Sequence, residues 1–344
     1  MVDYILVGLG LAGIAFCEKL EAHKKSFIVF DAGKKASSSV AGGIYNPVIL
    51  KRFTAAWNAG DQIKRIDPFY GSLESKLGVK LDYKQSVHRI FHSVEEQNLW
   101  FEASDKPTLE PFLSQNIHPN KNKAVVAPFG YGEVLHSGRI DTALLLEKYR
   151  GYLLKQDKLI ESSFEHHKLQ VSDTLEYGSF KAKHIVFAEG FGMKHNPFFK
   201  NLPLVGNKGE LLTIHAPELK LDTIIKSSVF IIPLGEDIYR VGATYNWKDK
   251  TPKATKEARE ELLNKLDKIV ACPYDVMEQD AGIRPTVIDR KPLVGRHSVY
   301  ENFYILNGLG THGVMIAPYV AEQLYDFIEK DSALDEEINI KRFM

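Results

Sequence analysis

The sequence contains very little cysteine and no long hydrophobic run. Its two cysteines, Cys17 and Cys272, lie far apart and outside any C-x-x-C spacing. This scarcity argues against a disulfide framework and against a thiolate zinc site, and it fits a reducing compartment. No segment approaches the roughly 18 consecutive apolar residues that a membrane-spanning helix needs, and strand-like sequence begins directly after Met1, where a signal peptide would stand. We therefore expect a cytoplasmic protein without membrane contact.

The sequence also lacks an excess of charge of either sign. Lys plus Arg and Asp plus Glu number 44 each. A balanced charge provides no general attraction to nucleic acid or to an anionic membrane. Internal repeats and low-complexity linkers are absent as well, whereas a hydrophobic content of 44% suffices for one large or two closely joined domains. Composition thus predicts an ordinary globular protein and identifies no partner.

A glycine-rich turn, VGLGLAG, stands near the start of the chain. Gly8, Gly10 and Gly13 follow a strand-like run at 4–7 and precede a helical pattern at 12–23. A strand that turns sharply into a helix allows backbone N–H groups to bind a pyrophosphate. A second apolar run ends in Asp31, close to the spacing at which a carboxylate binds the ribose of an adenine nucleotide. The order strand, glycines, helix, strand and acid predicts a dinucleotide site.

The pattern changes after residue 78, where alternating segments predict antiparallel strands instead of further βαβ units. Helices are expected at 57–77 with a break near Pro68, at 141–154 with Asp141 as N-cap, and at 255–270, and a strand is expected at 158–164. The segment HIVFAEGFG is interpreted as a core strand that returns to the nucleotide domain. We predict an α/β fold with an α+β insertion: a discontinuous Rossmann-like domain of 1–83, 135–203 and 279–344, and an antiparallel-sheet substrate domain of 84–134 and 204–278.

A second glycine turn precedes the last helix, at Gly308, Gly310 and Gly313. Dehydrogenases that use NAD normally continue from the first mononucleotide unit directly into a second one, and this sequence does not. The N-terminus of the last helix carries a partial positive charge that suits a flavin ring, because the reduced ring becomes anionic. The sequence therefore favours a flavin over a nicotinamide.

Taken together, these segments resemble the D-amino-acid oxidase family of FAD-dependent oxidoreductases, which includes glycine oxidase and sarcosine oxidase. The resemblance extends from end to end through VGLGLAG with Asp31, SSSVAGGI, NKGELLTI, IYRVGAT, AGIRPTVIDRKPLVGRH and NGLGTHGVMIAP. Within the family, the chain is most similar to the oxidase half of the bifunctional wobble-uridine tRNA modification enzyme. That likeness rests on GGIYNP, VGATYNW, GLGTHGVMIAPYVAEQL and NIKRF.

The resemblance implies an FAD-binding domain and a set of cofactor contacts. At the pyrophosphate and ribose it implies Gly8, Gly10, Leu11, Ala12, Gly13, Asp31 and Ala32. Near the ribityl chain and the flavin it implies Ser39, Ala41, Gly42 and Gly43. Around the adenine half it implies Ala188, Glu189, Gly190 and Phe164. At the ring it implies Gly310, Thr311, His312, Gly313 and Val314.

Several positions depart from the family pattern. Sarcosine oxidases attach their flavin to a cysteine in the segment that reads IRPTVID here, so we expect non-covalent FAD. Their carboxylate-binding lysine corresponds to Met315, although His312 is retained. Arg284 matches an arginine of glycine oxidase, whereas a second arginine and a tyrosine of that enzyme correspond to Thr311 and Phe230. These departures argue against a simple amino acid as the substrate.

The implied reaction oxidises the C–N bond of a primary or secondary amine to an imine by hydride transfer to flavin N5, with oxygen or another acceptor taking the electrons. Arg284 is a candidate for binding a substrate carboxylate, and the alternative is an ion pair with Asp280 or Asp289. His312 is a candidate for orienting the substrate or for a purely structural bond. Tyr45 and Tyr245 are candidates for an aromatic wall around the amine, with ordinary packing as the alternative.

Two other functions stay open at this point. The first is a tRNA wobble-uridine carboxymethylaminomethyl oxidase; the neutral net charge does not favour tRNA as a partner. Lys51 and Arg52 are candidates for contacting an anionic substrate or a tRNA phosphate, and the favoured alternative is a solvated loop. The second is a redox-silent flavin-binding protein. No metal site is expected, because the adjacent His166 and His167 would point to opposite faces of a strand.

Overall fold

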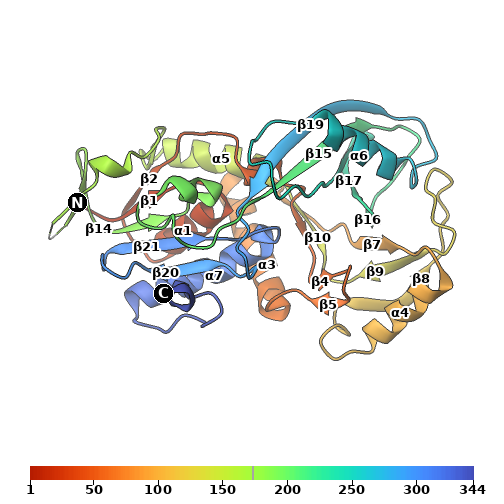
Figure 1. Ribbon diagram of the computed structural model, residues 1–344, viewed down its shortest axis with the longest axis horizontal. Helices are drawn as coiled ribbons and strands as arrows, with labels where there is room; N and C mark the ends of the chain where they lie inside the picture. The colour runs from red at the N-terminus through yellow and green to blue at the C-terminus, as the bar shows by residue number, and fades with distance from the viewer. Residues whose placement is uncertain (173) are drawn as a thin grey trace.

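Two large β-sheets organise the protein in a computed structural model that describes residues 1–172 and 174–344 (Figure 1). The first sheet has a parallel core in the order β11-β2-β1-β14-β21. Its strands come from three separated parts of the chain, so the carboxyl-terminal β21 lies beside strands of the first 190 residues. The core strands are β1 (Val2–Val7), β2 (Phe27–Phe30), β11 (Leu159–Ile160), β14 (Phe180–Phe187) and β21 (Phe303–Asn307). Antiparallel strands extend it: β12 (Gln170–Val171), β13 (Leu175–Tyr177) and β20 (Leu293–Arg296).

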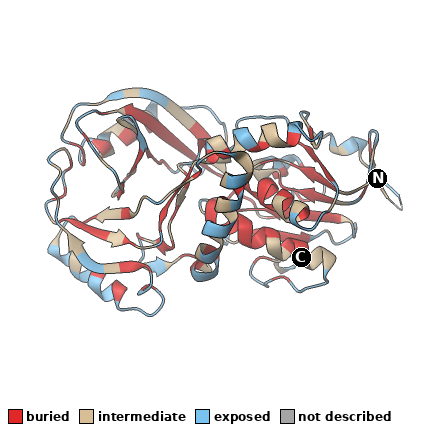
Figure 2. Cartoon of the chain, turned by 180° about the vertical axis from the view of Figure 1, so that it is seen from behind, coloured by how far each residue is buried: buried red, intermediate tan, exposed pale blue. Residues whose placement is uncertain are grey.

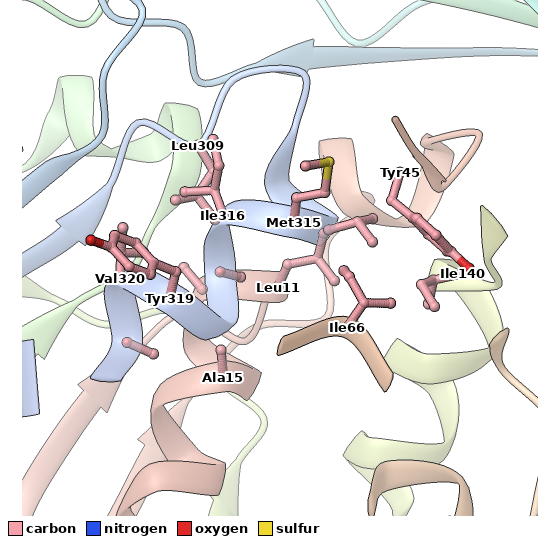
Figure 3. Close-up of a cluster of buried hydrophobic side chains, with 14 of the residues drawn as sticks. Leu11, Ala15, Tyr45, Ile66, Ile140, Leu309, Met315, Ile316, Tyr319 and Val320 are labelled. Carbon is pink, nitrogen blue, oxygen red and sulfur yellow. The ribbon is translucent and has the colours of Figure 1, made fainter. Parts of the chain in front are cut away.

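The helices α1 (Leu11–Ala22) and α7 (Gly313–Glu329) pack against each other beside the parallel sheet. Figure 3 shows Leu11 and Ala15 of α1 among Ile316 and Val320 of α7. Alanine on one helix opposite branched side chains on the other lets the two axes approach closely. Two further helices, α3 (Ala59–Leu77) and α5 (Thr142–Leu154), complete this core. Figure 2 shows the strands and the inner faces of these helices as largely buried.

The second large sheet runs in the order β19-β15-β18-β17-β16-β7-β9-β8, antiparallel except between β16 and β7. The helix α6 (Lys256–Leu266) covers one face, where Leu262 and Leu266 join a hydrophobic cluster with Ile214 and Val241. The strands are β7 (Val87–Ile90), β8 (Leu113–His118), β9 (Tyr131–Val134), β15 (Asn207–His215), β16 (Ile224–Lys226), β17 (Phe230–Gly235), β18 (Ile238–Gly242) and β19 (Asp275–Arg284).

Short elements connect the two large sheets. A three-stranded sheet has the order β3-β10-β6, and β4 pairs with β5 in a hairpin. These strands are β3 (Ile44–Tyr45), β4 (Val48–Ile49), β5 (Thr54–Ala55), β6 (Asp82–Tyr83) and β10 (Gly138–Ile140). The remaining helical segments are α2 (Ser37–Val40), α4 (Val94–Ser104) and the 3₁₀ turns η1 (His166–Lys168), η2 (Gly190–His195) and η3 (Ile340–Phe343).

The predicted fold class, a parallel nucleotide-type sheet with an inserted antiparallel sheet, is confirmed. The predicted N-cap Asp141 is confirmed, since its Oδ1 accepts from Leu144 N at 3.1 Å. Thr255 caps α6 in the same way, with its Oγ1 accepting from Ala258 N at 3.3 Å. The exact domain boundaries stay a prediction, and β19 crosses the one at 279. In the described part of the chain no helix is long and apolar enough to span a bilayer.

Three local expectations are wrong. The helix α3 continues through Pro68 without a break. Pro68 lies on its exposed side, where water can bind the carbonyl group that the missing N–H leaves free. The helix expected up to residue 270 ends at Leu266, and the strand expected over 158–164 is limited to β11.

Trp100 anchors the side of the antiparallel sheet that lies farthest from the parallel one. Its buried ring contacts Phe91 edge-on at 5.5 Å, and its Nε1 donates to the Ser114 carbonyl at 2.8 Å. We expect Trp100→Ala to lower the free energy of unfolding by about 3 to 5 kcal/mol, because a large cavity remains. The exposed Trp247 provides the control, since Trp247→Ala should change it by less than about 0.5 kcal/mol. Urea denaturation measures both, and equal losses would contradict the packing described here.

Candidate functional site

One cavity of about 560 Å³ lies where the carboxyl ends of the parallel strands meet the antiparallel sheet. Its lining combines both glycine turns, the 31–44 segment, the turn after β14 and residues of β15, β17 and β19. Among the predicted site residues, those on the lining are Gly8, Gly10, Leu11, Ala12, Asp31, Ala32, Ala41, Gly42, Gly43, Phe164, Ala188, Glu189, Gly190, Tyr245, Arg284, Gly310, Thr311, Gly313 and Val314. The structure thus brings most of them together, and their individual roles stay predictions.

The first glycine turn is shaped by close backbone contacts. Gly8 has φ +99°, and a Cβ there would lie 2.5 Å from the Ala188 carbonyl oxygen. A Cβ on Gly13 would lie 2.2 Å from the Gly8 carbonyl oxygen, so Gly13 packs behind the turn and does not line the cavity. Gly10 differs, because only Ser38 Oγ comes within 4 Å of its would-be Cβ, at 3.4 Å.

Gly10 is also the N-cap of α1 and has no side chain that could cap the helix; Ser38 Oγ accepts from Leu11 N only at 3.5 Å. The first N–H groups of a helix have no partner within it, and they carry a partial positive charge. Here they start at a residue whose missing side chain leaves room on the cavity side. The turn therefore fits a diphosphate group.

Asp31 is held rigidly at the end of β2. Its Oδ2 accepts from Leu9 N at 2.8 Å, and its Oδ1 accepts from Gly33 N at 2.8 Å and from Arg150 Nη1 at 2.5 Å. Arg150 also binds Glu161 at 2.8 Å. The carboxylate lies on the cavity lining, as a ribose contact requires.

At the end of the cavity that Asp31 lines, the turn after β14 forms the opposite wall. Glu189 is fixed there, since its Oε1 lies 2.9 Å from His166 Nε2 and its Oε2 accepts from Asn196 Nδ2 at 2.7 Å. Phe164 stacks on Tyr177 with ring centroids 4.1 Å apart. An apolar, aromatic wall beside a fixed carboxylate suits a flat heterocycle such as adenine.

The second glycine turn lies directly beside the first. Gly308 and Gly310 have φ values of +75° and +59°, and α7 starts at Gly313 without a capping side chain. A Cβ on Gly313 would lie 3.3 Å from Leu11 Cδ1, so the starts of α1 and α7 are in contact. The cavity therefore receives two helix N-termini, one from each end of the chain.

Arg284 ends β19 and lines the cavity near the second turn. Its Nη1 donates to Asn207 Oδ1 at 2.8 Å and to the Thr244 carbonyl at 3.3 Å, and its guanidinium lies 4.6 Å from the ring centroid of Tyr245. A Cβ on Gly209 would lie 2.1 Å from Arg284 Nη2, so this glycine makes the room that the guanidinium occupies.

Arg284 has no carboxylate within ion-pair distance in the described part of the chain. Asp280 binds Arg240 at 2.7 Å and also Lys35, and Asp289 binds Arg342 at 2.8 Å. Both acids of the alternative interpretation are therefore occupied elsewhere. Burial lowers the pKa of Arg284, which means that its charge is poorly solvated. An anionic ligand would supply the missing counter-charge.

Besides Gly13, the structure places three predicted residues away from the lining. Tyr45 is a correction: it lies in the hydrophobic core near Ile140 and Ile66 (Figure 3), and its hydroxyl donates to Asp82 Oδ1 at 2.8 Å. Ser39 bonds back to the Ala36 backbone at 2.8 and 3.2 Å, because it closes the first turn of α2; the neighbouring Ser37 and Ser38 line the cavity instead.

His312 is the third of these residues. It is half-buried as the N-cap of α7, and its Nδ1 lies 3.0 Å from Thr311 Oγ1. Burial lowers the pKa of His312, so the imidazole is neutral at pH 7. Its backbone carbonyl accepts from Met315 N and Ile316 N, which fixes the start of the helix.

Sequence reasoning missed the residues that hold Arg284, namely Asn207, Gly209 and Thr244. Register explains their position, since Asn207 pairs with Arg284 and Gly209 with Gly282 across β15 and β19. These partners lie more than 35 residues apart in the chain, and no local motif links them. The segment NKGELLTI was visible as a family signal, but its relation to Arg284 required the strand register.

Comparisons with known proteins agree with this geometry. The family model "FAD dependent oxidoreductase" (DAO) matches residues 3–326. The glycine oxidase of Bacillus licheniformis is 25% identical, over 95% of this chain and 92% of its own length. A tRNA 5-methylaminomethyl-2-thiouridine biosynthesis bifunctional protein of Idiomarina loihiensis is 28% identical, over 35% of this chain and 21% of its own length.

Among solved structures, glycine oxidase from Bacillus cereus ATCC 14579 has a TM-score of 0.81 at 18% identity, covering 97% of this chain and 96% of that one. At this identity the likeness concerns the fold. It confirms the fold class predicted from the sequence, and the family match confirms the resemblance.

The position of Tyr45 generates a prediction. We expect Tyr45→Phe to lower the free energy of unfolding by about 1 kcal/mol, because Asp82 loses a buried hydrogen-bond donor. Ligand binding in the cavity should not change, since Tyr45 does not line it. Tyr245→Phe is the control: this tyrosine is 62% exposed, and its loss of a hydroxyl should cost less than about 0.5 kcal/mol. Chemical denaturation measures both losses. A larger loss of stability in Tyr245→Phe than in Tyr45→Phe would contradict the position of Tyr45 in the core.

Proposed function

This chain belongs to the DAO family of FAD-dependent oxidoreductases with FAD as cofactor, and from that premise we propose that it oxidises the C–N bond of a small primary or secondary amine bearing a carboxylate. The observation that carries the substrate assignment is Arg284, a poorly solvated cation on the cavity lining without a carboxylate partner in the described residues. The glycine oxidase relatives support an amine as the substrate class.

The residues present fit FAD along the whole length of the cavity. The uncapped start of α1 would bind the diphosphate, Asp31 the adenosine ribose, and the start of α7 the rim of the ring system. Bound FAD would supply a two-electron acceptor for the hydride that leaves the carbon next to the amine. Neither Cys17, buried in α1, nor Cys272 lines the cavity, which supports non-covalent binding.

Arg284 would bind the substrate carboxylate and thereby set the direction of the amine. A guanidinium can hold a carboxylate through two parallel hydrogen bonds, which fixes both position and rotation. Asn207 and the Thr244 carbonyl bind Nη1, and the missing side chain of Gly209 makes the room in which the guanidinium lies. Tyr245 packs on the guanidinium and would form the outer wall beside the substrate.

The neighbouring side chains are suited to hydride transfer without a strong base. When the amine is neutral, its lone pair assists departure of the hydride, and the nitrogen proton is lost afterwards to give the imine, which water hydrolyses. His312 stays neutral because burial lowers its pKa, so it adds no positive charge that would disfavour the cationic imine product. The electrons then pass to oxygen or to another acceptor.

A second candidate function is oxidation of the carboxymethylaminomethyl group of a tRNA wobble uridine. The partial match to the bifunctional tRNA modification protein favours it, as do the exposed Lys51 and Arg52 beside β4. The balanced net charge does not, because tRNA binding depends on many phosphate contacts. The same C–N chemistry would serve both candidates, and they differ in the size of the molecule that carries the amine.

The proposed function has a direct test. The purified protein is expected to show a flavin absorption band, which should bleach when a carboxylate-bearing amine is added without oxygen. A suitable panel contains glycine, sarcosine, iminodiacetate, proline and the corresponding amines that lack a carboxylate. Bleaching by members with a carboxylate supports the proposal. A flavin that no member reduces would favour a redox-silent protein, and reduction only by the amines without a carboxylate would remove the role of Arg284.

Replacement of Arg284 tests the carboxylate contact. We expect Arg284→Met to raise the KM for the amine that the panel identifies by about 10- to 100-fold, since a hydrogen bond between charged groups contributes about 1.5 to 3 kcal/mol. Binding of FAD should be unchanged, as measured by the flavin absorbance of the purified variant. The control is Arg290→Met, which removes an exposed arginine six residues away and should leave the KM unaltered. An unchanged KM in Arg284→Met would contradict the assignment.

A further inference from the structure

Behind Arg284, strand β15 buries a second cation. Lys208 is fully buried, and it lies between Asn207 and Gly209, the two residues that accommodate the Arg284 guanidinium. Because side chains alternate along a strand, Lys208 and Glu210 project to the face opposite that of Asn207 and Gly209. The strand thus carries the arginine site on one face and a buried polar cluster on the other.

The ammonium group of Lys208 holds the segment 246–255, which follows β18. Its Nζ donates to Asp249 Oδ2 at 2.6 Å and to the Lys253 carbonyl at 2.5 Å, and it lies 3.1 Å from Glu210 Oε1. The Lys208 backbone exchanges two hydrogen bonds of 2.9 Å with Asn246. One residue therefore contacts this segment at its start, middle and end.

Glu210 fixes the far end of the same segment. It accepts from Thr255 N and Thr255 Oγ1, both at 2.8 Å, and from Gln279 Nε2 at 2.8 Å. Thr255 in turn is the N-cap of α6. The segment 246–255 is consequently tied to β15 and to the helix that covers the antiparallel sheet.

Most of the other hydrogen bonds of the segment lie within it: Asn246 Oδ1 accepts from Lys248 N and Asp249 N, and Asp249 Oδ1 accepts from Thr251 N and Oγ1. Lys250 Nζ also donates to the Gly206 carbonyl at 2.9 Å. Trp247 is 47% exposed, and Lys248 and Lys250 are also exposed or half-buried. Yet Tyr245, directly before it, and Pro252, within it, both line the cavity. Burying an ammonium costs free energy unless hydrogen-bonding partners surround it. The cluster around Lys208 therefore favours one position of the segment, whereas an apolar side chain at residue 208 would allow the segment to shift.

We propose that Lys208 is a positioning residue of the substrate site, because its ammonium fixes the segment 246–255 and with it the wall that Tyr245 and Pro252 form beside Arg284. This inference rests on the proposed function, in which Arg284 binds a carboxylate. Lys208 itself touches neither cofactor nor substrate, since it does not line the cavity.

The charge state of the cluster is stable across physiological pH. Burial disfavours the ammonium, but the bonds from Asp249 and Glu210 outweigh it and raise the pKa of Lys208. The bond from Lys208 lowers the pKa of Asp249 to about 2. Lysine and aspartate therefore both stay ionised, and the tie between them does not switch between pH 5 and 9.

The variant Asp249→Asn tests the proposal without leaving a buried charge unpaired, because Lys208 keeps Glu210 and the Lys253 carbonyl. Methoxyacetate, a carboxylate without an oxidisable amine, serves as the probe through its perturbation of the flavin spectrum. We expect its Kd to rise about fivefold to tenfold, the KM of the substrate to rise equally and kcat to change less than twofold. Trypsin should cleave at Lys248, Lys250 or Lys253 about tenfold faster, while flavin content stays constant.

Two further variants complete the experiment. Asp237→Asn is the matched control, since it removes the carboxylate that pairs with Lys220 at the turn between β17 and β18. This variant should change none of these quantities. Lys208→Met combined with Asp249→Asn should raise the Kd no further than the stronger single variant, because both act through one contact. If Lys208→Met does not fold, Asp249→Asn decides alone.

The outcomes separate the two proposals. Wild-type values for Kd, KM and trypsin cleavage in Asp249→Asn would overturn the positioning role while the proposed function stands. A wild-type protein that does not bind methoxyacetate would overturn both, because no carboxylate site would exist to be positioned. Faster cleavage with an unchanged Kd would make the cluster merely structural and would also overturn the inference.

Discussion

The contact between the starts of α1 and α7 is the constraint on which the site depends. Leu11 of the first helix and Gly313 of the last are so close that any side chain at Gly313 would press on Leu11. This proximity requires small residues at the turns, a parallel sheet that places β1 and β21 on either side of β14, and a chain that returns to its first domain at its end. The antiparallel sheet is then inserted where the chain leaves that domain, which sets Arg284 beside the second turn.

Electrostatics follow from the same arrangement. Two helix N-termini, the Arg284 guanidinium and two lining lysines, Lys34 and Lys35, contribute positive potential to a single cavity. Asp31 is paired with Arg150, and Glu189 is hydrogen-bonded to His166 and Asn196. This potential suits anionic groups, as the proposed diphosphate and carboxylate contacts require. A protein of zero formal net charge can thus contain a locally positive site.

The parts of the site that sequence could predict are the ones encoded locally. Gly8, Gly10 and Asp31 belong to one continuous motif whose spacing dictates strand, turn, helix and acid, so their placement at the cavity followed from about 30 residues. Tyr45 was misplaced because its neighbours Gly42 and Gly43 do line the cavity, whereas the alternation of β3 turns its ring to the core. The surroundings of Arg284 depend on strand register between distant segments, which no local pattern contains.

The departures from the family pattern acquire a physical meaning in this geometry. Met315, which corresponds to a carboxylate-binding lysine in sarcosine oxidases, is fully buried in the core and does not line the cavity. Phe230 and Thr311, which correspond to a tyrosine and an arginine of glycine oxidase, do line it and carry no charge. Under the proposed function, carboxylate recognition would fall to Arg284, whose orientation depends on the strand that also buries Lys208. Because Tyr245 is exposed, a substrate bound to Arg284 as proposed would have room to extend outward from the site.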